Sequence, residues 1–136
     1  MGEVRLEWTG DRLQFVGQTA YGEPVLTGGN ANGPGAKPSD LLPMSLAACT
    51  AYDVVEILRK QRQQLRGLAV VITSEQDPDP PWTFRAIHMR FLLTGTVEEG
   101  KAARAVALAE SKYCAVAATI RSVVRLSHDV EISEAS

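Results

Sequence analysis

Two cysteines are the residues of this chain with the most distinctive chemistry. Cys49 lies inside a long helical pattern, Leu41 to Leu65, and Cys114 lies at the start of a second helical pattern. Thiols in proteins are used chiefly for their reactivity, and the thiolate is the nucleophilic form. The chain has no CxxC pair and only two histidines, which argues against a zinc or thioredoxin-type site. The function therefore depends on whether these two sulfurs can meet.

The position of Cys49 on its helix leaves two interpretations open. At 100° per residue, Cys49 falls on the same side as Asp53 and Glu56. The opposite side, expected to pack on a sheet, consists of Ala47, Ala51, Val54, Val55 and Leu58. A thiol outside the apolar stripe favours a reactive group at an interface or cleft. The alternative is a small space-filling residue in a tight helix contact.

Neighbouring charges distinguish the two thiols. Asp53 lies one helical turn beyond Cys49, and a nearby anion raises the pKa of a thiol. A cation must therefore compensate, and Arg12 is one candidate. Cys114 lies near a helix start with a lysine two positions before it, and both features favour its thiolate. Local electrostatics thus predicts that Cys114 is the more acidic thiol.

The remaining polar residues do not indicate a second chemistry. His88 falls on the non-core face of the strongest predicted strand, and His128 precedes the last strand. Each is expected to be a surface or hydrogen-bonded histidine, and no Ser-His-Asp arrangement or Gly-x-Ser-x-Gly elbow is apparent. The glycine-rich segment lacks the GxxxxGK[ST] order of a phosphate-binding loop. These patterns predict neither a hydrolase nor a nucleotide site.

The elements that must position the thiols follow from the hydrophobic pattern and the turn residues. Strands are predicted near residues 4–8, 13–17, 23–27, 68–75, 84–94 and 129–133, and helices near 39–65, 98–112 and 114–126. Ser39 or Asp40 is expected to cap the first helix. The core face of the strongest strand is predicted to carry Ile87, Met89, Phe91 and Leu93. The order β-β-β-α-β-β-α-α-β indicates an α+β fold with helices on one side of the sheet.

Length and composition bound the function. The 136 residues suit one domain, with N-terminal strands at 1–27, a glycine-rich loop at 28–37 and a helix-sheet core at 38–136. A net charge of −2 without basic clusters predicts no binding to nucleic acid or to a membrane surface. No segment is expected to be long and apolar enough to span a membrane, and no signal peptide is apparent. We therefore expect a cytoplasmic protein, in which a transient, catalytic disulfide is more natural than a structural one.

Two segments resemble the OsmC-like proteins, a family that includes the organic hydroperoxide resistance proteins. One segment runs from Lys37 to Val55 around Ala47-Ala48-Cys49, and the other runs from Glu110 to Ala117 around Lys112-Tyr113-Cys114. The strand order on either side matches too, so the resemblance covers essentially the whole chain. The Lys-Tyr-Cys string is most similar to the YhfA-like branch.

The resemblance implies a fold and a reaction. The implied fold is an antiparallel sheet of about six strands wrapped on a long central helix, in an intertwined homodimer with active sites at the subunit interface. It implies that Cys49 is the peroxidatic cysteine and Cys114 the resolving cysteine of an organic hydroperoxide reductase in oxidative-stress defence. No bound cofactor or metal is expected, because an external dithiol, a lipoylated protein in the hydroperoxide-resistance branch, supplies the electrons.

The chain departs from the family pattern at the groups that would activate the thiol. The family carries a glutamate ten residues before the first cysteine, where this chain has Ser39 beside Asp40. The family also uses an arginine from the N-terminal strands, for which Arg12 is the nearest candidate; Asp53 and Glu56 are further supporting candidates. Such an arginine–carboxylate pair lowers the thiol pKa and orients peroxide. The alternative function is therefore a non-catalytic dimer that binds an apolar or electrophilic small molecule.

Overall fold

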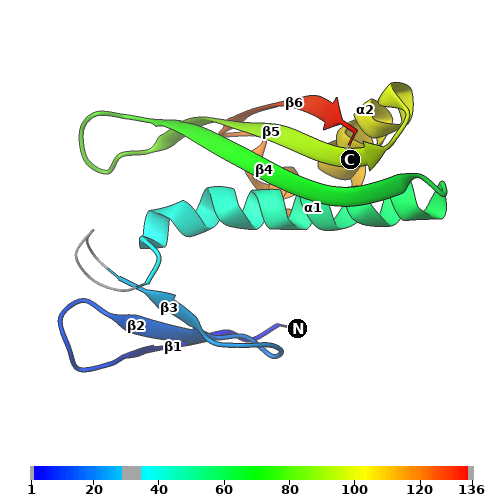
Figure 1. Cartoon of the computed structure of the whole chain (residues 1–136). Helices are drawn as coiled ribbons and strands as arrows, with labels where there is room; N and C mark the ends of the chain where they lie inside the picture. Colours follow the sequence, from blue (N-terminus) through cyan, green and yellow to red (C-terminus); the bar gives the residue numbers. More distant parts are fainter. Residues whose placement is uncertain (1, 29–34, 135–136) are drawn as a thin grey trace. The chain divides into compact units, whose positions relative to one another are not determined.

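The computed structural model describes residues 2–28 and 35–134 (Figure 1). The elements are β1 (Arg5–Trp8), β2 (Phe15–Gln18), β3 (Val25–Thr27), the 3-10 turn η1 (Pro38–Asp40), α1 (Leu41–Lys60), β4 (Gln64–Gln76), β5 (Phe84–Thr96), α2 (Glu99–Leu108), the π-helical turn η2 (Ala109–Tyr113), α3 (Ala115–Ile120) and β6 (Arg125–Ser133). The predicted order of strands and helices and the α+β class are confirmed. The chain divides into two compact units, Met1–Leu42 and Pro43–Ser136.

The first unit contains a small antiparallel sheet. Its strands follow the order β1-β2-β3, with Leu6 opposite Gly17 and Phe15 opposite Thr27. Thr27 also forms a parallel bridge to Ala36, across the segment predicted as a glycine-rich loop. Residues 29–34 of that segment lie outside the described part of the chain.

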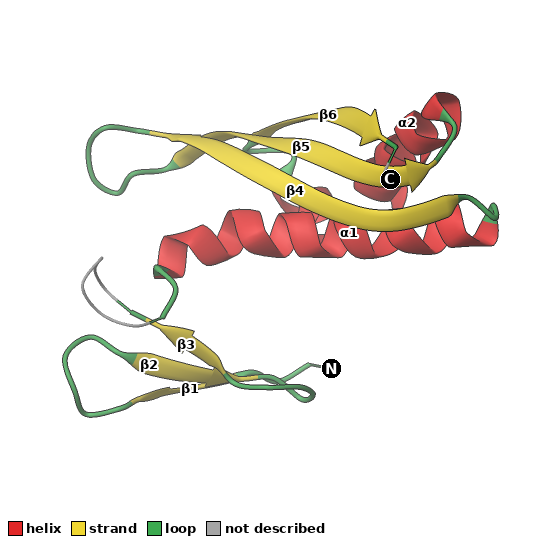
Figure 2. Ribbon diagram, in the orientation of Figure 1, coloured by secondary structure: helices red, strands yellow, loops and turns green. Residues whose placement is uncertain are grey.

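The second unit contains a longer sheet in the order β4-β5-β6. Strands β4 and β5 form an antiparallel hairpin, whereas β5 and β6 are parallel. The expectation of one antiparallel sheet of about six strands was therefore wrong for this chain, which forms two three-stranded sheets. The parallel pair arises because α2, η2 and α3 form a crossover between β5 and β6, as a parallel connection requires (Figure 2).

The core of this unit lies on one face of the β4-β5-β6 sheet. The predicted inward face of β5 is confirmed, because Ile87, Met89, Phe91 and Leu93 are each at most 1% exposed. The helical contributions to the same cluster come from Leu46, Ala47, Val54 and Leu58 of α1 and from Ala102, Ala105 and Val106 of α2. Burial of each large apolar side chain stabilises the fold by about 1.5–3 kcal/mol. Helix α1 is thereby held along the sheet (Figure 2).

The buried stripe of α1 is rotated relative to the predicted one. It includes Leu46 and Thr50, both fully buried, and the Thr50 hydroxyl donates to the Leu46 carbonyl at 2.7 Å. The expected placement of Cys49 opposite the apolar side was wrong, because Cys49 is half-buried and packs against the core. A threonine whose hydroxyl bonds to a carbonyl of its own helix can be buried although it is polar. A prediction based on apolar residues alone therefore omits Thr50 from the buried stripe.

Both ends of α1 differ from the prediction. The helix follows directly on η1, whose N-cap is Lys37 without a side-chain cap, so Ser39 and Asp40 do not cap it. At the other end the helix stops at Lys60 because Arg62 takes a left-handed φ of 57°. Such a residue ends a helix in a Schellman motif, and the Gln63 N–H accordingly donates to the Leu58 carbonyl at 2.9 Å.

The bounds of the last two elements also shift. Helix α3 ends at Ile120 and β6 begins at Arg125, so the predicted helix 114–126 is shorter and the final strand longer than expected. Leu126 and Ile132 are half-buried between exposed neighbours, and residues 128–130 between them are all half-buried. The parallel pairing with β5 covers nine residues of β6.

The segment Pro38–Lys60 is long and apolar enough to cross a membrane by length and composition alone. It has 23 residues, and one 18-residue window has a mean hydropathy of 1.5 with 28% of the window buried. It is not an unbroken apolar run, because it contains Asp40, Asp53 and Glu56. A core helix meets the same criteria, and α1 packs Leu46, Val54 and Leu58 into the core.

Candidate thiol site

The two cysteines lie together in the second unit. Cys49 belongs to α1, Cys114 immediately precedes α3, both are free thiols, and Cys114 lies near enough to raise the pKa of Cys49. A disulfide between them would bring the two sulfurs to a bond length of about 2.05 Å. The sequence interpretation depends on the two sulfurs meeting, and the structure places both cysteines near each other within one unit of one chain; their reaction with each other stays a prediction.

Cys114 is held at the start of α3 by three backbone-linked contacts. Its extended backbone makes it the N-cap, and its Sγ accepts from the Ala117 N–H at 3.4 Å. Its own N–H donates to the Ala109 carbonyl at 2.9 Å, and its carbonyl accepts from the Ala118 N–H at 3.0 Å. The side chain is 1% exposed. The expectation that Cys114 begins a helix is confirmed, and the sulfur is shielded from solvent.

Cys49 is the more accessible of the two thiols. Burial raises its pKa first, and the hydrogen bond with Cys114 raises the pKa further. The backbone N–H groups of Val116 and Ala115 act in the opposite direction, and the net effect is a raised pKa. These N–H groups belong to the first turn of α3, where unpaired donors favour an anion. The site therefore favours the neutral thiol of Cys49 while offering donors to its thiolate.

The turn before Cys114 is fixed by an arginine. The Arg121 guanidinium donates to the carbonyls of Glu110 at 3.0 Å, Ser111 at 3.2 Å and Ala117 at 3.3 Å. Carbonyls at the end of a helical turn lack partners within the helix, and the planar fork of arginine can satisfy several at once. Arg121 thereby ties η2 to α3 on either side of Cys114. Sequence analysis did not assign this role.

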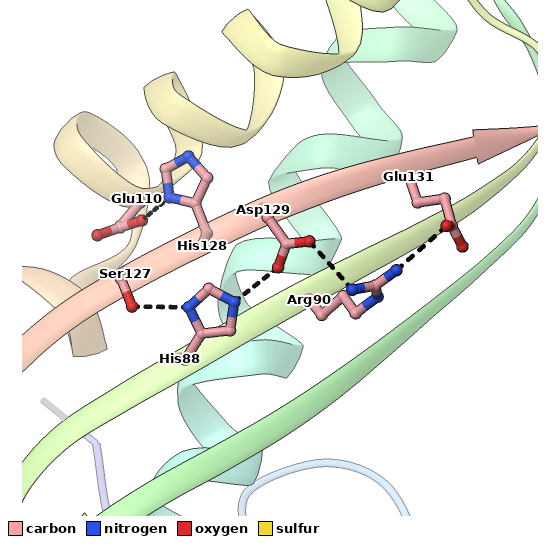
Figure 3. Close-up of polar contacts among 7 residues, drawn as sticks. All are labelled: His88, Arg90, Glu110, Ser127, His128, Asp129 and Glu131. Carbon is pink, nitrogen blue, oxygen red and sulfur yellow. Dashed lines mark hydrogen bonds and ion pairs between the residues drawn. The ribbon is translucent and has the colours of Figure 1, made fainter.

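A second contact ties η2 to the sheet. The Glu110 carboxylate lies 2.5 Å from Nδ1 of His128 on β6 (Figure 3), and the two side chains are 17% and 28% exposed. The hydrogen bond with Glu110 is the main cause that raises the pKa of His128, with partial burial opposing it and the charges of Glu110 and Asp129 adding to it. The expectation of a hydrogen-bonded His128 is confirmed.

The outer face of β5 and β6 carries a polar network (Figure 3). His88 Nδ1 lies 2.7 Å from Ser127 Oγ, and His88 Nε2 lies 2.6 Å from Asp129 Oδ1. Arg90 continues the network to Asp129 and Glu131. The expectation of no Ser-His-Asp arrangement was therefore wrong, because the side chains of Ser127, His88 and Asp129 are in hydrogen-bond contact. Its charged and histidine members are 41% to 60% exposed, which is typical of a surface ion-pair network worth about 0–1 kcal/mol per pair.

Three predicted supporting residues belong to the first unit. Arg12 lies between β1 and β2 with a φ of 48°, and its carbonyl accepts from the Trp8 indole N–H at 2.9 Å. Ser39 and Asp40 lie in η1. Their roles toward the thiols stay predictions.

The other two supporting candidates lie on α1 with Cys49. Asp53 is half-buried and Glu56 is exposed. Neither is among the groups that shift the pKa of Cys49 within the described residues, where burial and Cys114 are the causes that raise it. Within residues 2–28 and 35–134, no three side chains of the His, Cys, Asp or Glu type are grouped to hold a metal ion.

Comparison with known proteins gives consistent similarities. A family model described as OsmC-like protein matches residues 29–129. Protein YhfA of Escherichia coli (strain K12) is 34% identical over 131 residues, which cover 96% of this chain and 97% of the relative. A hypothetical protein from Aquifex aeolicus VF5 has a similar solved structure, with a TM-score of 0.88 and 27% identity over 100% of this chain and 98% of the other. The organic hydroperoxide resistance protein OhrB of Bacillus subtilis shares the fold, with a TM-score of 0.59 and 16% identity over 98% of each chain.

Proposed function

This chain belongs to the OsmC-like protein family, and on that premise we propose that it is a thiol-dependent reductase of organic hydroperoxides. The observation that carries the proposal is the neighbouring pair of free thiols, half-buried Cys49 near fully buried Cys114. An accessible thiol backed by a shielded one is the arrangement that a peroxidatic and a resolving cysteine require. OhrB of Bacillus subtilis, which shares the fold, is an organic hydroperoxide resistance protein, and this agrees with the proposed chemistry.

The reaction proceeds through three balanced steps. The Cys49 thiolate attacks the O–O bond of the hydroperoxide, which releases an alkoxide that takes up a proton and leaves a sulfenic acid on Cys49. The Cys114 thiol then attacks that sulfur, forming the Cys49–Cys114 disulfide and releasing water. An external dithiol finally reduces the disulfide through a mixed disulfide and is itself oxidised. No bound cofactor enters this cycle, and a lipoylated protein is one such dithiol.

The start of α3 provides the groups that would assist the first step. The N–H groups of Ala115 and Val116 donate toward the Cys49 sulfur, where negative charge is present on the thiolate. The same donors would stabilise the sulfur as it is oxidised. We propose that this pair takes over part of the role that an arginine has in other members of the family, and that Arg12 adds to it.

We propose a second copy of this chain as the partner. Large apolar side chains are exposed on α1, where Met44 is 54% and Tyr52 is 67% exposed, and on β1, where Leu6 and Trp8 are each 60% exposed. A chain that leaves such residues in water is typical of a subunit whose interface is unoccupied. Sedimentation of the protein at micromolar concentration, in a buffer of cytoplasmic pH and ionic strength, is expected to give the mass of a dimer. A monomer mass at that concentration would contradict the homodimer.

The proposed reaction is tested by following the two thiols. One equivalent of cumene hydroperoxide is expected to convert the reduced protein to a Cys49–Cys114 disulfide, with both thiols lost in step, as read by mass spectrometry of the alkylated peptides. Added dithiothreitol should restore both thiols. Recovery of two free thiols after the peroxide treatment would reject the proposal.

The surroundings of Cys49 are also compatible with a second candidate function. Burial and Cys114 raise the pKa of Cys49, which disfavours the nucleophilic thiolate and suits a non-catalytic dimer that binds an apolar or electrophilic small molecule. The two candidates differ in turnover with a dithiol present. Repeated consumption of hydroperoxide supports the reductase, whereas a single stoichiometric modification of Cys49 supports the binding protein.

A further inference from the structure

The position of Cys114 depends on the turn that precedes it. Turn η2 closes through a bond from the Cys114 N–H to the Ala109 carbonyl, five residues earlier, and has no side-chain cap at its start. Such π-helical turns are rare and cost stability, so they persist where other contacts hold them. Arg121 holds η2 to α3. These two elements lie on either side of Cys114 in the segment that connects β5 to β6, so Arg121 does not attach this segment to the sheet. Ala109, Cys114 and Ala117 belong to the apolar core that covers the sheet, but apolar packing is not directional, so a directional contact with the sheet must come from a polar pair.

We propose that Glu110 and His128 are positioning residues of the thiol pair: their side-chain contact ties η2 to β6 and so keeps the Cys114 sulfur against Cys49. The contact joins the turn four residues before Cys114 to a strand paired along its length with the central strand β5. Both side chains are partly buried, which makes a charge-assisted hydrogen bond stronger and more directional than a fully exposed surface pair. The inference takes its biological meaning from the proposed function, since the resolving step requires the two sulfurs to stay in reach.

The charges around His128 make this link dependent on pH. Glu110 faces the imidazole from η2, Asp129 neighbours it on β6, and Glu99 of α2 and Glu134 line the same shallow cavity of about 680 Å³. Of these acidic groups, Glu110 and Asp129 favour the imidazolium. Because the pKa of His128 is raised in the folded protein, the charged link is present at low pH and weakens as the pH rises through that pKa.

The test separates positioning from thiol reactivity and needs no peroxide. Ellman's reagent first forms a mixed disulfide with Cys49, releasing one thionitrobenzoate in a bimolecular phase. The Cys114 thiolate then attacks the Cys49 sulfur, closing the disulfide and releasing a second thionitrobenzoate in a phase independent of reagent concentration. In Glu110→Gln and His128→Gln the second phase is expected to slow by about tenfold, with the first phase within about twofold of wild type. The double variant should be no slower than the slower single one, since the two side chains act as a unit.

Matched controls decide the outcome. Glu131→Gln removes an acid of the same strand that pairs with Arg90 on the outer face, and it should leave both phases unchanged. Glu110→Gln has the size of the native side chain, and an unchanged near-ultraviolet circular dichroism spectrum shows that it folds. The ratio of the wild-type to the His128→Gln closure rate should fall toward one as the pH rises above the ordinary histidine pKa of about 6.5. Wild-type closure rates in both single variants, equal slowing in Glu131→Gln, or a ratio independent of pH would overturn the proposal.

The two proposals fail in different ways. A protein that closes its disulfide with Ellman's reagent but leaves hydroperoxide intact would refute the reductase and keep the positioning roles. A protein that turns over hydroperoxide while the Glu110 and His128 variants close at the wild-type rate would refute the positioning roles alone.

Discussion

Replacing Cys49 with serine is expected to lower the rate of organic hydroperoxide consumption by at least about 10³-fold. Serine places an oxygen where the sulfur lies, half-buried beside Cys114 and the start of α3. An alcohol is not measurably ionised at neutral pH and does not attack an O–O bond, whereas a thiolate does. The rate is measured as loss of cumene hydroperoxide with dithiothreitol as the reductant. The loss should not come from unfolding, because the exchange changes the side-chain volume little.

Cys114→Ser is the matched control, because it removes the other thiol and leaves the attacking one. This variant should consume one equivalent of hydroperoxide and stop at a sulfenic acid on Cys49, which dimedone traps for mass spectrometry. The reversed pattern, with an inert Cys114→Ser and a sulfenic acid on Cys114 in Cys49→Ser, would exchange the two roles. That outcome would favour the local electrostatic argument from the sequence over the family resemblance.

The strand β5 and the order of elements could be predicted because burial leaves a direct trace in the sequence. Alternating Ile87, Met89, Phe91 and Leu93 can be buried together only as one face of a strand, and the structure buries all four. The segment around Cys49 could likewise be predicted as a helix. Its apolar residues are spaced three and four positions apart, so they share one face of a helix and would not share one face of a strand. What the pattern left out was the rotation of that helix, since Thr50 is polar by type and fully buried in place.

The remaining features depend on contacts between distant residues or on unusual backbone. Arg62 ends α1 in a left-handed conformation that usually marks a glycine, so composition gave no warning of the helix end. The adjacency of Cys49 and Cys114 depends on how η2 is placed, and η2 is held by Glu110 and a histidine 18 positions away. No local propensity encodes such a pair. The resemblance to a family predicted that the thiols meet, and only the structure identifies the contacts around them.

The rate at which Cys49 reacts with iodoacetamide is expected to rise by about tenfold per pH unit between about pH 7 and pH 8.5. The reason is the raised pKa of Cys49, which burial and the hydrogen bond with Cys114 produce. Iodoacetamide reacts with the thiolate, so at pH values below the pKa the rate is proportional to the thiolate fraction. Because the pKa of Cys49 is raised, this fraction should still increase with pH across the whole range. Cys114→Ser removes one of the two causes that raise the pKa, and its profile should shift toward lower pH. The measurement is the pseudo-first-order rate of carbamidomethylation of the Cys49 peptide at each pH.

A plateau in this dependence of the alkylation rate on pH would contradict the raised pKa of Cys49. If the rate in the wild-type protein is already constant from about pH 7 upward, the thiol is ionised at neutral pH, and a cation outside the contacts of the second unit must stabilise it. Arg12 is the candidate from the sequence, so Arg12→Gln should then restore the rising profile. A plateau that survives Arg12→Gln would direct attention to a second copy of the chain as the source of the charge. The pH profile of one thiol thus distinguishes activation by the N–H groups of α3 alone from activation by an arginine that the assembled protein brings to the site.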